Sequence, residues 1–337
     1  MKQSCVDRRS LLLGSIAGAA VSFADTRPAS AAADASKSLP GIRVSEDRIT
    51  RKIAGLRPFR PSGFVVGIDR IGDKTLLHNY GHGGCGVTLS WGTADMAAKL
   101  ALQTSYRRAA VIGCGAIGLA TARLLQDRGF DVAIYAKEVP PNTTSNIAAA
   151  LFGVTSLVDD AHHTGEIVGR IQQAARFAHR YFQNFIGERY GVRWIDFFLI
   201  GDQPQEQPWD FAITPELYPL TVIAPADNPF PVNYASRFPT LFIETNIYLP
   251  QILSDFLLRG GQLHVRDFAD RAELAEIAAP LIVNCTGLGA KDLYMFPRRD
   301  AVILGGSHQQ GIWSTEPDEA QAARIFEGHK QIAAGMR

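Results

Sequence analysis

The sequence predicts an α/β fold built around a parallel sheet, and three observations lead to that expectation. An apolar strand, Ala109–Ile112, runs into a glycine-rich turn and a helix, Ala116–Arg128, and a second apolar strand, Asp131–Tyr135, follows. Such a strand–helix–strand unit holds its two strands parallel. The run Gln262–Asn284 repeats the pattern after a long helix with an apolar face, Gly165–Arg189. The chain is therefore expected to build a sheet, leave it and return to it.

The other elements follow from local patterns. Two short strands, Gly63–Ile71 and Lys74–Asn79, meet at a tight Gly72-Asp73 turn. A helix over Thr93–Leu102 leads to the first strand of the parallel unit, and the proline-rich segment Gln203–Pro231 predicts surface loops. The remaining expected elements are strands at Val192–Ile200, Gln262–Phe268 and Pro280–Asn284 and helices at Leu249–Leu258 and Ala272–Ile277.

Length and composition are those of an ordinary globular protein. The 337 residues are 46% hydrophobic and 20% charged, which suits about two domains. A formal net charge of +1 gives no electrostatic basis for binding nucleic acid or an acidic membrane. The cysteines and the histidine pair His162–His163 show no metal-ligand spacing, and no disulfide framework is expected.

The first 33 residues have the pattern of an export signal. Arg8 and Arg9 precede an apolar run from Leu11 to Phe23, and an Ala-Xaa-Ala pattern stands at Ala29–Ala31. Adjacent arginines are typical of the twin-arginine type, so the bacterial periplasm is the expected location. The alternative is a disordered basic tail on a cytoplasmic protein. The apolar run is too short to span a membrane stably.

The G-x-G-x-x-G pattern of Gly113, Gly115 and Gly118 stands where a strand ends and a helix begins. The first glycine allows a tight turn, the second lets a pyrophosphate approach the backbone, and the third lets the helix pack on the strand. The helix N-terminus then favours the phosphate charge. The pattern predicts a dinucleotide site that includes Ile117, and it does not separate FAD from NAD.

Polar residues after the second strand are candidates for the rest of this site. An acidic partner for a ribose is expected near Lys137 and Glu138. A solvated surface charge is the alternative for Glu138. Thr143, Thr144 and Ser145 follow in a loop and offer hydroxyl donors, with a plain turn as the competing account.

A second glycine-rich stretch, His78–Gly92, stands just before the fingerprint. It reads HNYGHGGCGVTLSWG and holds five glycines. Glycines at this density let backbone N–H groups approach a flat or anionic ligand. Two glycine loops beside one dinucleotide fold suggest a large cofactor held at two places.

Five segments together resemble the FAD-dependent D-amino-acid oxidase family. They are HNYGHGGCGVTLSWG, Gly55–Pro61 (GLRPFRP), Ile134–Phe152 (IYAKEVPPNTTSNIAAALF), Asn284–Gly287 (NCTG) and Tyr294–Gly306 (YMFPRR…LGG), and they span most of the mature chain. The resemblance implies a Rossmann-like FAD-binding domain interleaved with a mixed-sheet substrate domain. It also implies a reaction in which hydride leaves Cα of a D-amino acid for the flavin, O2 becomes H2O2, and the imino acid hydrolyses to a 2-oxo acid and ammonia.

The resemblance also assigns roles to single residues. Arg57 matches the arginine that binds the substrate carboxylate, a task that suits a guanidinium fork. Tyr294 matches a tyrosine that positions the same carboxylate, and Gly84 matches the glycine whose carbonyl accepts from the substrate amine. The remaining matches are FAD contacts, with Gly83, Cys85, Gly86, Val87 and Thr88 around the flavin ring and Thr143, Thr144, Ser145 and Thr286 elsewhere on the cofactor.

Two features depart from the family pattern. GLRP and HNYGHGG precede the fingerprint, whereas the family places them near its C-terminus, so a circularly permuted order is expected, with Gln103–Arg108 joining the former ends. Only Leu288–Leu293 separates NCTG from Tyr294, so a strand-bearing stretch of the substrate domain is missing. Smaller departures are Ala150 where a glycine is usual, Lys137 where an acid is common, and Arg298 where some members carry a second tyrosine.

The expected domain order combines these points. Residues 1–33 are the signal, 34–50 a linker, 51–160 the FAD-binding domain, 161–250 the substrate domain, 251–290 a return to the FAD-binding domain, and 291–337 a truncated remainder of the substrate domain. The leading hypothesis is an FAD-dependent oxidase of D-amino acids, with a homodimer among the possible assemblies. The alternatives are a catalytically impaired flavin-binding remnant, a glycine or other amine oxidase of the same family, and an NAD-dependent dehydrogenase.

Overall fold

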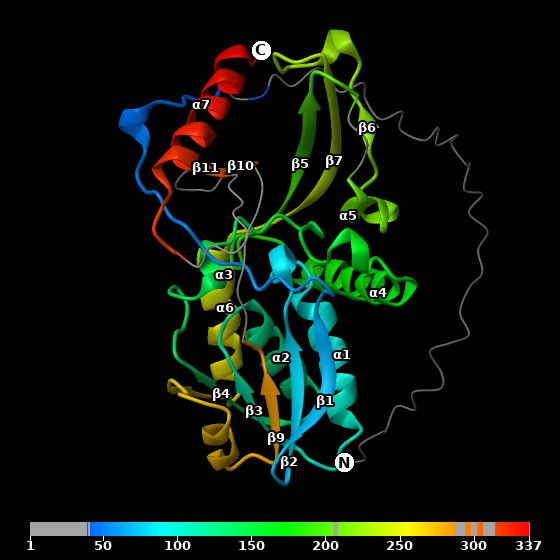
Figure 1. Ribbon diagram of the computed structural model, residues 1–337, viewed down its shortest axis with the longest axis vertical. Helices are drawn as coiled ribbons and strands as arrows, with labels where there is room; N and C mark the ends of the chain where they lie inside the picture. The colour runs from blue at the N-terminus through cyan, green and yellow to red at the C-terminus, as the bar shows by residue number, and fades with distance from the viewer. Residues whose placement is uncertain are drawn as a thin grey trace, which may run out of the picture. The chain divides into compact units, whose positions relative to one another are not determined.

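A six-stranded sheet forms the centre of the computed structural model, which describes residues 39, 41–204, 208–286, 294–297, 302–305 and 314–336. The strand order is β1-β2-β9-β3-β4-β8 (Figure 1), and every neighbouring pair is parallel except β1 and β2. Strand β9 comes from the second strand–helix–strand run and lies between β2 and β3, so the predicted return to the first sheet is confirmed. The strands are β1 Val65–Ile71, β2 Lys74–Tyr80, β3 Arg108–Ile112, β4 Asp131–Ala136, β8 Gln262–Val265 and β9 Leu281–Asn284.

Both faces of this sheet are buried, because successive side chains of a strand point to opposite faces. Leu77, Val111 and Val283 belong to the core that includes helices α1 and α2, whereas Leu76 and Ile282 pack with the segment after β8. The long helices of this region are α1 Ser90–Leu102, α2 Ala116–Asp127 and α6 Thr245–Leu258, and the segment after β8 carries the 3-10 helix η7 Ala272–Glu276.

A second sheet is antiparallel and has the order β5-β7-β6. Strand β5 (Val192–Gly201) pairs along its whole length with β7 (Tyr234–Ile243), and β6 is only Thr221–Val222. Helix α4 (Gly165–Phe182) precedes this sheet and contacts α1. The remaining elements are α3 Thr144–Ile147, α5 Trp209–Ala212, the β10 Tyr294–Pro297 and β11 Val302–Gly305 hairpin, α7 Glu319–Gly335, and 3-10 helices at Glu46–Arg48, Gly83–Cys85, Asp160–His162, Gln183–Phe185, Pro215–Leu217 and Pro225–Asp227.

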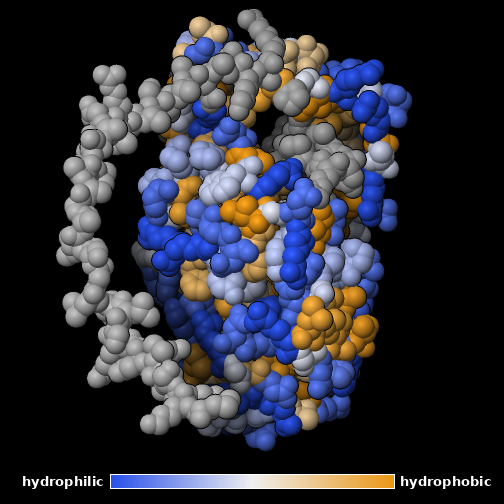
Figure 2. All heavy atoms as spheres, turned by 180° about the vertical axis from the view of Figure 1, so that it is seen from behind, coloured by the Kyte–Doolittle hydropathy of each residue, from blue (hydrophilic) through white to orange (hydrophobic). Residues whose placement is uncertain are grey.

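Hydrophilic residues cover much of the face seen in Figure 2, and hydrophobic patches interrupt them. Within the described ranges, the structure contains no helix with the length and apolar character needed to cross a bilayer. The predicted export signal and residues 34–38 and 40 of the predicted linker lie outside the described residues.

Several predicted boundaries differ from the observed ones. Helix α4 ends at Phe182 and not at Arg189, and a 3-10 turn continues its apolar face to Phe185. Helix α6 begins at Thr245, before the predicted start at Leu249, and it contains Pro250, which cannot donate a helical hydrogen bond. Strand β7 was not predicted at all.

Helix α1 also begins earlier than predicted, and Gly92 explains why. This glycine lies inside α1, where a Cβ would come within 2.0 Å of the Ala174 carbonyl oxygen on α4. A glycine inside a helix is usually destabilising, but here it permits close backbone contact between two helices. The sequence pattern at Gly92 suggests a turn, and the tertiary contact overrides it.

Replacing Ala150 by glycine should stabilise the protein. Ala150 has a φ of 55°, a left-handed conformation that costs an L-residue roughly 1–2 kcal/mol. Glycine avoids this cost, but it loses more conformational entropy than alanine on folding, which costs about 0.5–1 kcal/mol. We expect Ala150→Gly to raise the free energy of unfolding by about 0.5–1 kcal/mol, measured by urea unfolding. The matched control is Ala148→Gly, because Ala148 has a φ of −59° and should lose stability. Equal effects of the two substitutions would contradict the argument.

Candidate cofactor and substrate site

The fingerprint glycines occupy positions where a side chain does not fit. Gly113 has a φ of +113°, and its Cβ would lie 2.8 Å from the Cys285 carbonyl oxygen. A Cβ on Gly118 would lie 2.0 Å from the Gly113 carbonyl oxygen. The first contact joins the ends of β3 and β9, and the second packs α2 onto the turn. These contacts are the ones that the G-x-G-x-x-G pattern predicts.

The N-terminus of α2 offers backbone donors to an anion. Among the described residues, the amides of Gly115, Ile117 and Gly118 have no hydrogen-bond partner. Gly115 and Ile117 are half-buried, so this end of the helix remains accessible. Three open N–H groups at a helix N-terminus fit the pyrophosphate of a dinucleotide.

The predicted hydroxyl residues lie on or beside α3. Ser145 accepts a hydrogen bond from the Ala116 amide at 3.0 Å, so α3 lies against the start of α2. The Thr143 hydroxyl is buried and donates to Asn146 Oδ1 at 2.7 Å, whereas Thr144 is exposed. The structure therefore brings Ser145 to the phosphate end of the fingerprint, and Thr143 fixes the turn that carries it.

Lys137 and Glu138 follow the carboxyl end of β4, and both are exposed. Lys137 Nζ lies 2.7 Å from Asp267 Oδ2, and this hydrogen bond and ion pair raise the pKa of the lysine. Asp267 follows the neighbouring strand β8 and was not predicted as a site residue. The available signal was an acidic residue near the end of the predicted strand Gln262–Phe268. The strand ends of β4 and β8 thus present a lysine and two carboxylates beside the fingerprint.

Two segments far apart in the sequence hold the second glycine loop. The Gly83 amide donates to the Pro58 carbonyl at 2.9 Å, and the Gly84 amide donates to the Ser156 carbonyl at 3.2 Å. Gly83 has a φ of +52°, and a Cβ there would lie 2.0 Å from Ser156 O. Cys85 adds two contacts to the same segment. Its Sγ donates to the Thr155 carbonyl at 2.8 Å and accepts from the Thr155 amide at 3.0 Å.

Arg57 and Gly84 meet in this arrangement. Arg57 Nη1 lies 2.9 Å from the position that a Cβ of Gly84 would take, and it donates to Ser156 Oγ at 3.4 Å. Arg57 is half-buried and Gly84 is exposed. The structure therefore places a guanidinium group directly beside an accessible glycine backbone.

Thr88 lies in the interior. It is 2% exposed, and its Oγ1 is 3.0 Å from Gly153 O and 3.2 Å from Leu151 O. The hydroxyl thus binds the segment after α3. Cys85 and Val87 are also buried, while Gly86 is half-buried. Backbone groups are consequently the accessible part of residues 83–88.

Two other predicted residues follow strands. Thr286 is exposed beyond the end of β9, where its amide and its hydroxyl both hydrogen-bond Asn284 Oδ1, at 3.3 and 2.9 Å. The backbone of Tyr294 begins β10 and pairs with Gly305, and its side chain lies outside the described part of the structure.

His82 makes the glycine loop sensitive to acid. Burial lowers the pKa of His82 from 6.5 to about 3. Between pH 6.5 and about pH 3, His82 is therefore protonated in the unfolded chain and neutral in the folded one. The free energy of unfolding consequently falls as the pH drops through this range, by up to about 1.4 kcal/mol per pH unit. The ring stacks on Phe64 and its Nε2 lies 2.9 Å from Thr93 Oγ1.

Urea unfolding at pH 7 and pH 5 measures this effect. We expect the wild type to lose more stability between the two values than His82→Gln, which cannot titrate. The control is His162→Gln, because His162 is exposed and its removal should keep the wild-type slope. A wild-type slope in His82→Gln would contradict the assignment.

Fold and site together define a dinucleotide-binding protein with an arginine beside a glycine loop. A family model described as FAD dependent oxidoreductase (DAO) matches residues 7–100 and 108–293. The chain belongs to this family. It is an FAD-dependent oxidoreductase, and the open amides of α2 and the side-chain-free turn suit the FAD pyrophosphate.

Individual relatives are distant. The chain is 26% identical over 266 residues to the D-amino acid oxidase of Dugesia ryukyuensis, with 67% of this chain and 78% of that protein covered. It is 28% identical over 260 residues to the D-amino-acid oxidase of Rubrobacter xylanophilus, with 65% and 75% covered. Among solved structures, the glycine oxidase of Bacillus cereus aligns with a TM-score of 0.49 and 14% identity, over 68% of this chain and 78% of that one.

Proposed function

We propose that the chain oxidises D-amino acids, with Arg57 and Gly84 at its substrate site. The observation that carries the proposal is the contact between these residues, which come from separate segments of the chain and meet beside a cofactor-binding fold. The two D-amino-acid oxidases that the chain resembles support it.

In the proposed complex, Arg57 and Gly84 hold the substrate. The Arg57 guanidinium binds the carboxylate through two parallel charge-assisted hydrogen bonds, and the Gly84 carbonyl accepts a hydrogen bond from the amine. Two anchors fix the direction of the Cα–H bond, which is the main requirement for hydride transfer. A side chain at position 84 would meet Thr155 O at 2.7 Å and Arg57 Nη1 at 2.9 Å, so glycine keeps this space open.

Bound FAD would supply the redox chemistry, as an acceptor of the hydride from Cα and a source of two electrons for O2. In the net reaction a D-amino acid, O2 and water give a 2-oxo acid, ammonia and H2O2. The chain's own groups hold the cofactor. We assign the pyrophosphate to the amides of Gly115, Ile117 and Gly118, the flavin ring to the backbone of residues 83–88, and a further contact to Thr286.

Anaerobic mixing of the FAD-loaded protein with amino acids tests the proposal. At least one neutral D-amino acid should bleach the flavin absorbance, and its L-enantiomer should not. Admission of air should then release H2O2 and 2-oxo acid in equal amounts. If only glycine or sarcosine bleaches the flavin, the protein is a glycine or other amine oxidase and the proposed D-amino-acid substrate class is wrong. Bound FAD that no amine bleaches would overturn the proposal in favour of an impaired flavin-binding remnant.

We propose a circularly permuted order for this chain. The family model matches in two segments, and the break between residues 100 and 108 coincides with the expected junction. Two further features support the order. A tight turn, in which the Thr104 amide and hydroxyl bond to Ala101 O, links α1 to β3. Lys52 near the new start forms an ion pair with Glu319 at the start of α7.

A relinked chain tests the permutation. Joining Arg337 to Gly41 through a short linker and opening the chain between Leu102 and Arg108 should give a protein that folds and binds FAD as the original does. An unfolded product from several linker lengths would contradict a permuted origin.

Export by the twin-arginine route is our proposal for the location. Arg8 and Arg9 before an apolar run carry it. The mature protein should appear in the periplasmic fraction of a bacterial host, and the pair Arg8→Lys with Arg9→Lys should retain it in the cytoplasm. A periplasmic yield that the double substitution leaves unchanged would contradict this route.

A further inference from the structure

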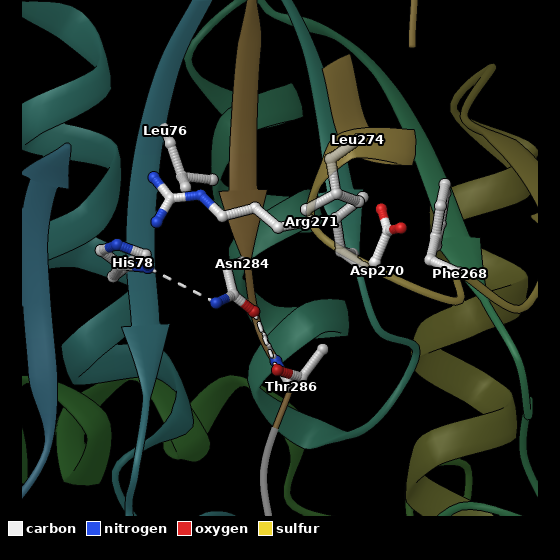
Figure 3. Close-up of a pocket in the computed structure, with 9 residues that line it drawn as sticks. Leu76, His78, Phe268, Asp270, Arg271, Leu274, Asn284 and Thr286 are labelled. Carbon is white, nitrogen blue, oxygen red and sulfur yellow. Dashed lines mark hydrogen bonds between the residues drawn. The ribbon is translucent and has the colours of Figure 1, made fainter. Parts of the chain in front are cut away.

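We propose that His78 is a positioning residue for FAD, acting through Asn284 on Thr286. The inference rests on the proposed contact between Thr286 and FAD. The residues involved line a cavity of about 280 Å³ between β2, β9, β3 and the segment after β8. Figure 3 shows His78 directed from β2 toward Asn284 and Asn284 directed toward Thr286.

The orientation of the Asn284 amide is fixed by its neighbour. The backbone N–H of Thr286 can only donate, so the atom it meets at 3.3 Å must be the Asn284 oxygen Oδ1. The other end of the amide, Nδ2, therefore faces His78 and lies 3.4 Å from its Nδ1. Because an amide NH2 can only donate, His78 Nδ1 must accept.

This acceptor role determines the state of the imidazole. A neutral ring that accepts at Nδ1 carries its hydrogen at Nε2, which lies 3.5 Å from Asp69 Oδ2. Asp69 is held in turn by Arg271, which donates to Asp69 Oδ2 and to the Arg70 carbonyl, both at 2.8 Å. The chain of contacts thus runs from a surface ion pair through His78 and Asn284 to Thr286.

The consequence for the cofactor concerns the Thr286 hydroxyl. This group lies 2.9 Å from Asn284 Oδ1, which can only accept, so the hydroxyl donates its hydrogen bond to that oxygen. It then presents lone pairs to a ligand. Lone pairs suit a hydroxyl donor and repel phosphate oxygens, so Thr286 is set to accept from a ribityl or ribose hydroxyl of FAD. If His78 cannot accept, the Asn284 amide loses the contact that holds its Nδ2 end, and only its two hydrogen bonds from Thr286 remain. Asn284 Oδ1 is then a less firmly positioned acceptor, and the Thr286 hydroxyl is held less firmly in the orientation that presents its lone pairs.

Two substitutions of His78 test the inference. His78→Leu removes the acceptor, and His78→Gln supplies another in its side-chain carbonyl. We measure the dissociation constant of FAD from quenching of flavin fluorescence on addition to the FAD-free protein. His78→Leu should weaken FAD binding about five- to tenfold, the size of one hydrogen bond, and His78→Gln should restore most of it. Leu274→Ala, which changes another wall of the same cavity, should keep the wild-type value.

A double-substitution cycle separates positioning from a general structural effect. With Thr286→Val in place, His78→Leu should cause little further loss, because both act through one hydroxyl. Additive losses, equal losses in the Leu and Gln variants, or a wild-type dissociation constant in His78→Leu would overturn the proposal. If His78→Leu does not fold, Asn284→Leu interrupts the same chain and must weaken FAD binding for the proposal to stand. If Thr286→Val alone leaves FAD binding unchanged, the proposed contact between Thr286 and FAD is wrong, and the role of His78 falls with it.

Discussion

Arg57→Leu should lower kcat/KM for the best D-amino acid by about 30- to 1,000-fold, the cost of about 2–4 kcal/mol expected when one partner of a hydrogen-bonded charge pair is removed. The half-buried guanidinium lies beside Gly84, the other residue of the proposed substrate site. Arg57→Lys keeps the charge and loses the two-pronged geometry, and it should lie between wild type and Arg57→Leu. Steady-state kinetics on FAD-loaded protein provide the measurement.

The matched control is Arg60, which belongs to the same GLRPFRP loop. Its Nε donates to the Gly63 carbonyl at 3.2 Å, and its guanidinium lies 5.8 Å from the centre of the Tyr80 ring. We therefore expect Arg60→Leu to alter stability and to keep kcat/KM near the wild-type value. FAD affinity should be unchanged in Arg57→Leu, since Arg57 is assigned to substrate. Wild-type kcat/KM in that variant, with FAD bound, would exclude Arg57 as the carboxylate partner.

The sequence predicted the parallel sheet because its signals are local. Ala109–Ile112 and Leu281–Val283 are buried apolar runs, and the G-x-G-x-x-G turn allows one arrangement of strand and helix. Strand β7 was missed because Pro239 interrupts its pattern. It is tolerated because Pro239 lies beyond the two residues of β7 that pair with β6, so that position needs no donor toward β6.

The candidate site was predictable where a motif or resemblance names a residue, as for Arg57, Gly84 and the fingerprint glycines. Contacts that depend on strand order were not. His78 and Asn284 lie on β2 and β9, which are neighbours only because the chain returns to the sheet between β2 and β3. Asp267 meets Lys137 for the same reason, across β4 and β8. The inward direction of the Thr88 hydroxyl depends on residues 151–153, which no local pattern places.

The two cofactor motifs are joined by a buried ion pair, and breaking it should destabilise the protein strongly. Asp95 on α1 accepts from Arg128, which follows α2, and lies 2.7 Å from Lys99 Nζ. Its side chain is 5% exposed. Asp95→Ala leaves Arg128 partly buried without its counter-charge. Its Nη1 has no hydrogen-bond partner within the described part of the chain. We expect a loss of about 3–5 kcal/mol in the free energy of unfolding, measured by urea denaturation of the FAD-free protein.

Two comparisons show whether this loss comes from the uncompensated charge. Lys99→Ala removes the partner that is 58% exposed, and it should change the free energy of unfolding by less than about 1 kcal/mol. Asp95→Leu combined with Arg128→Met removes both charges and should recover much of the stability lost in Asp95→Ala, because apolar pairs replace buried ion pairs at little cost. If the double variant is as unstable as Asp95→Ala, the pair instead holds α1 and α2 in a geometry that apolar packing cannot reproduce. FAD affinity should then fall with stability, since α1 carries the glycine loop and α2 carries the fingerprint.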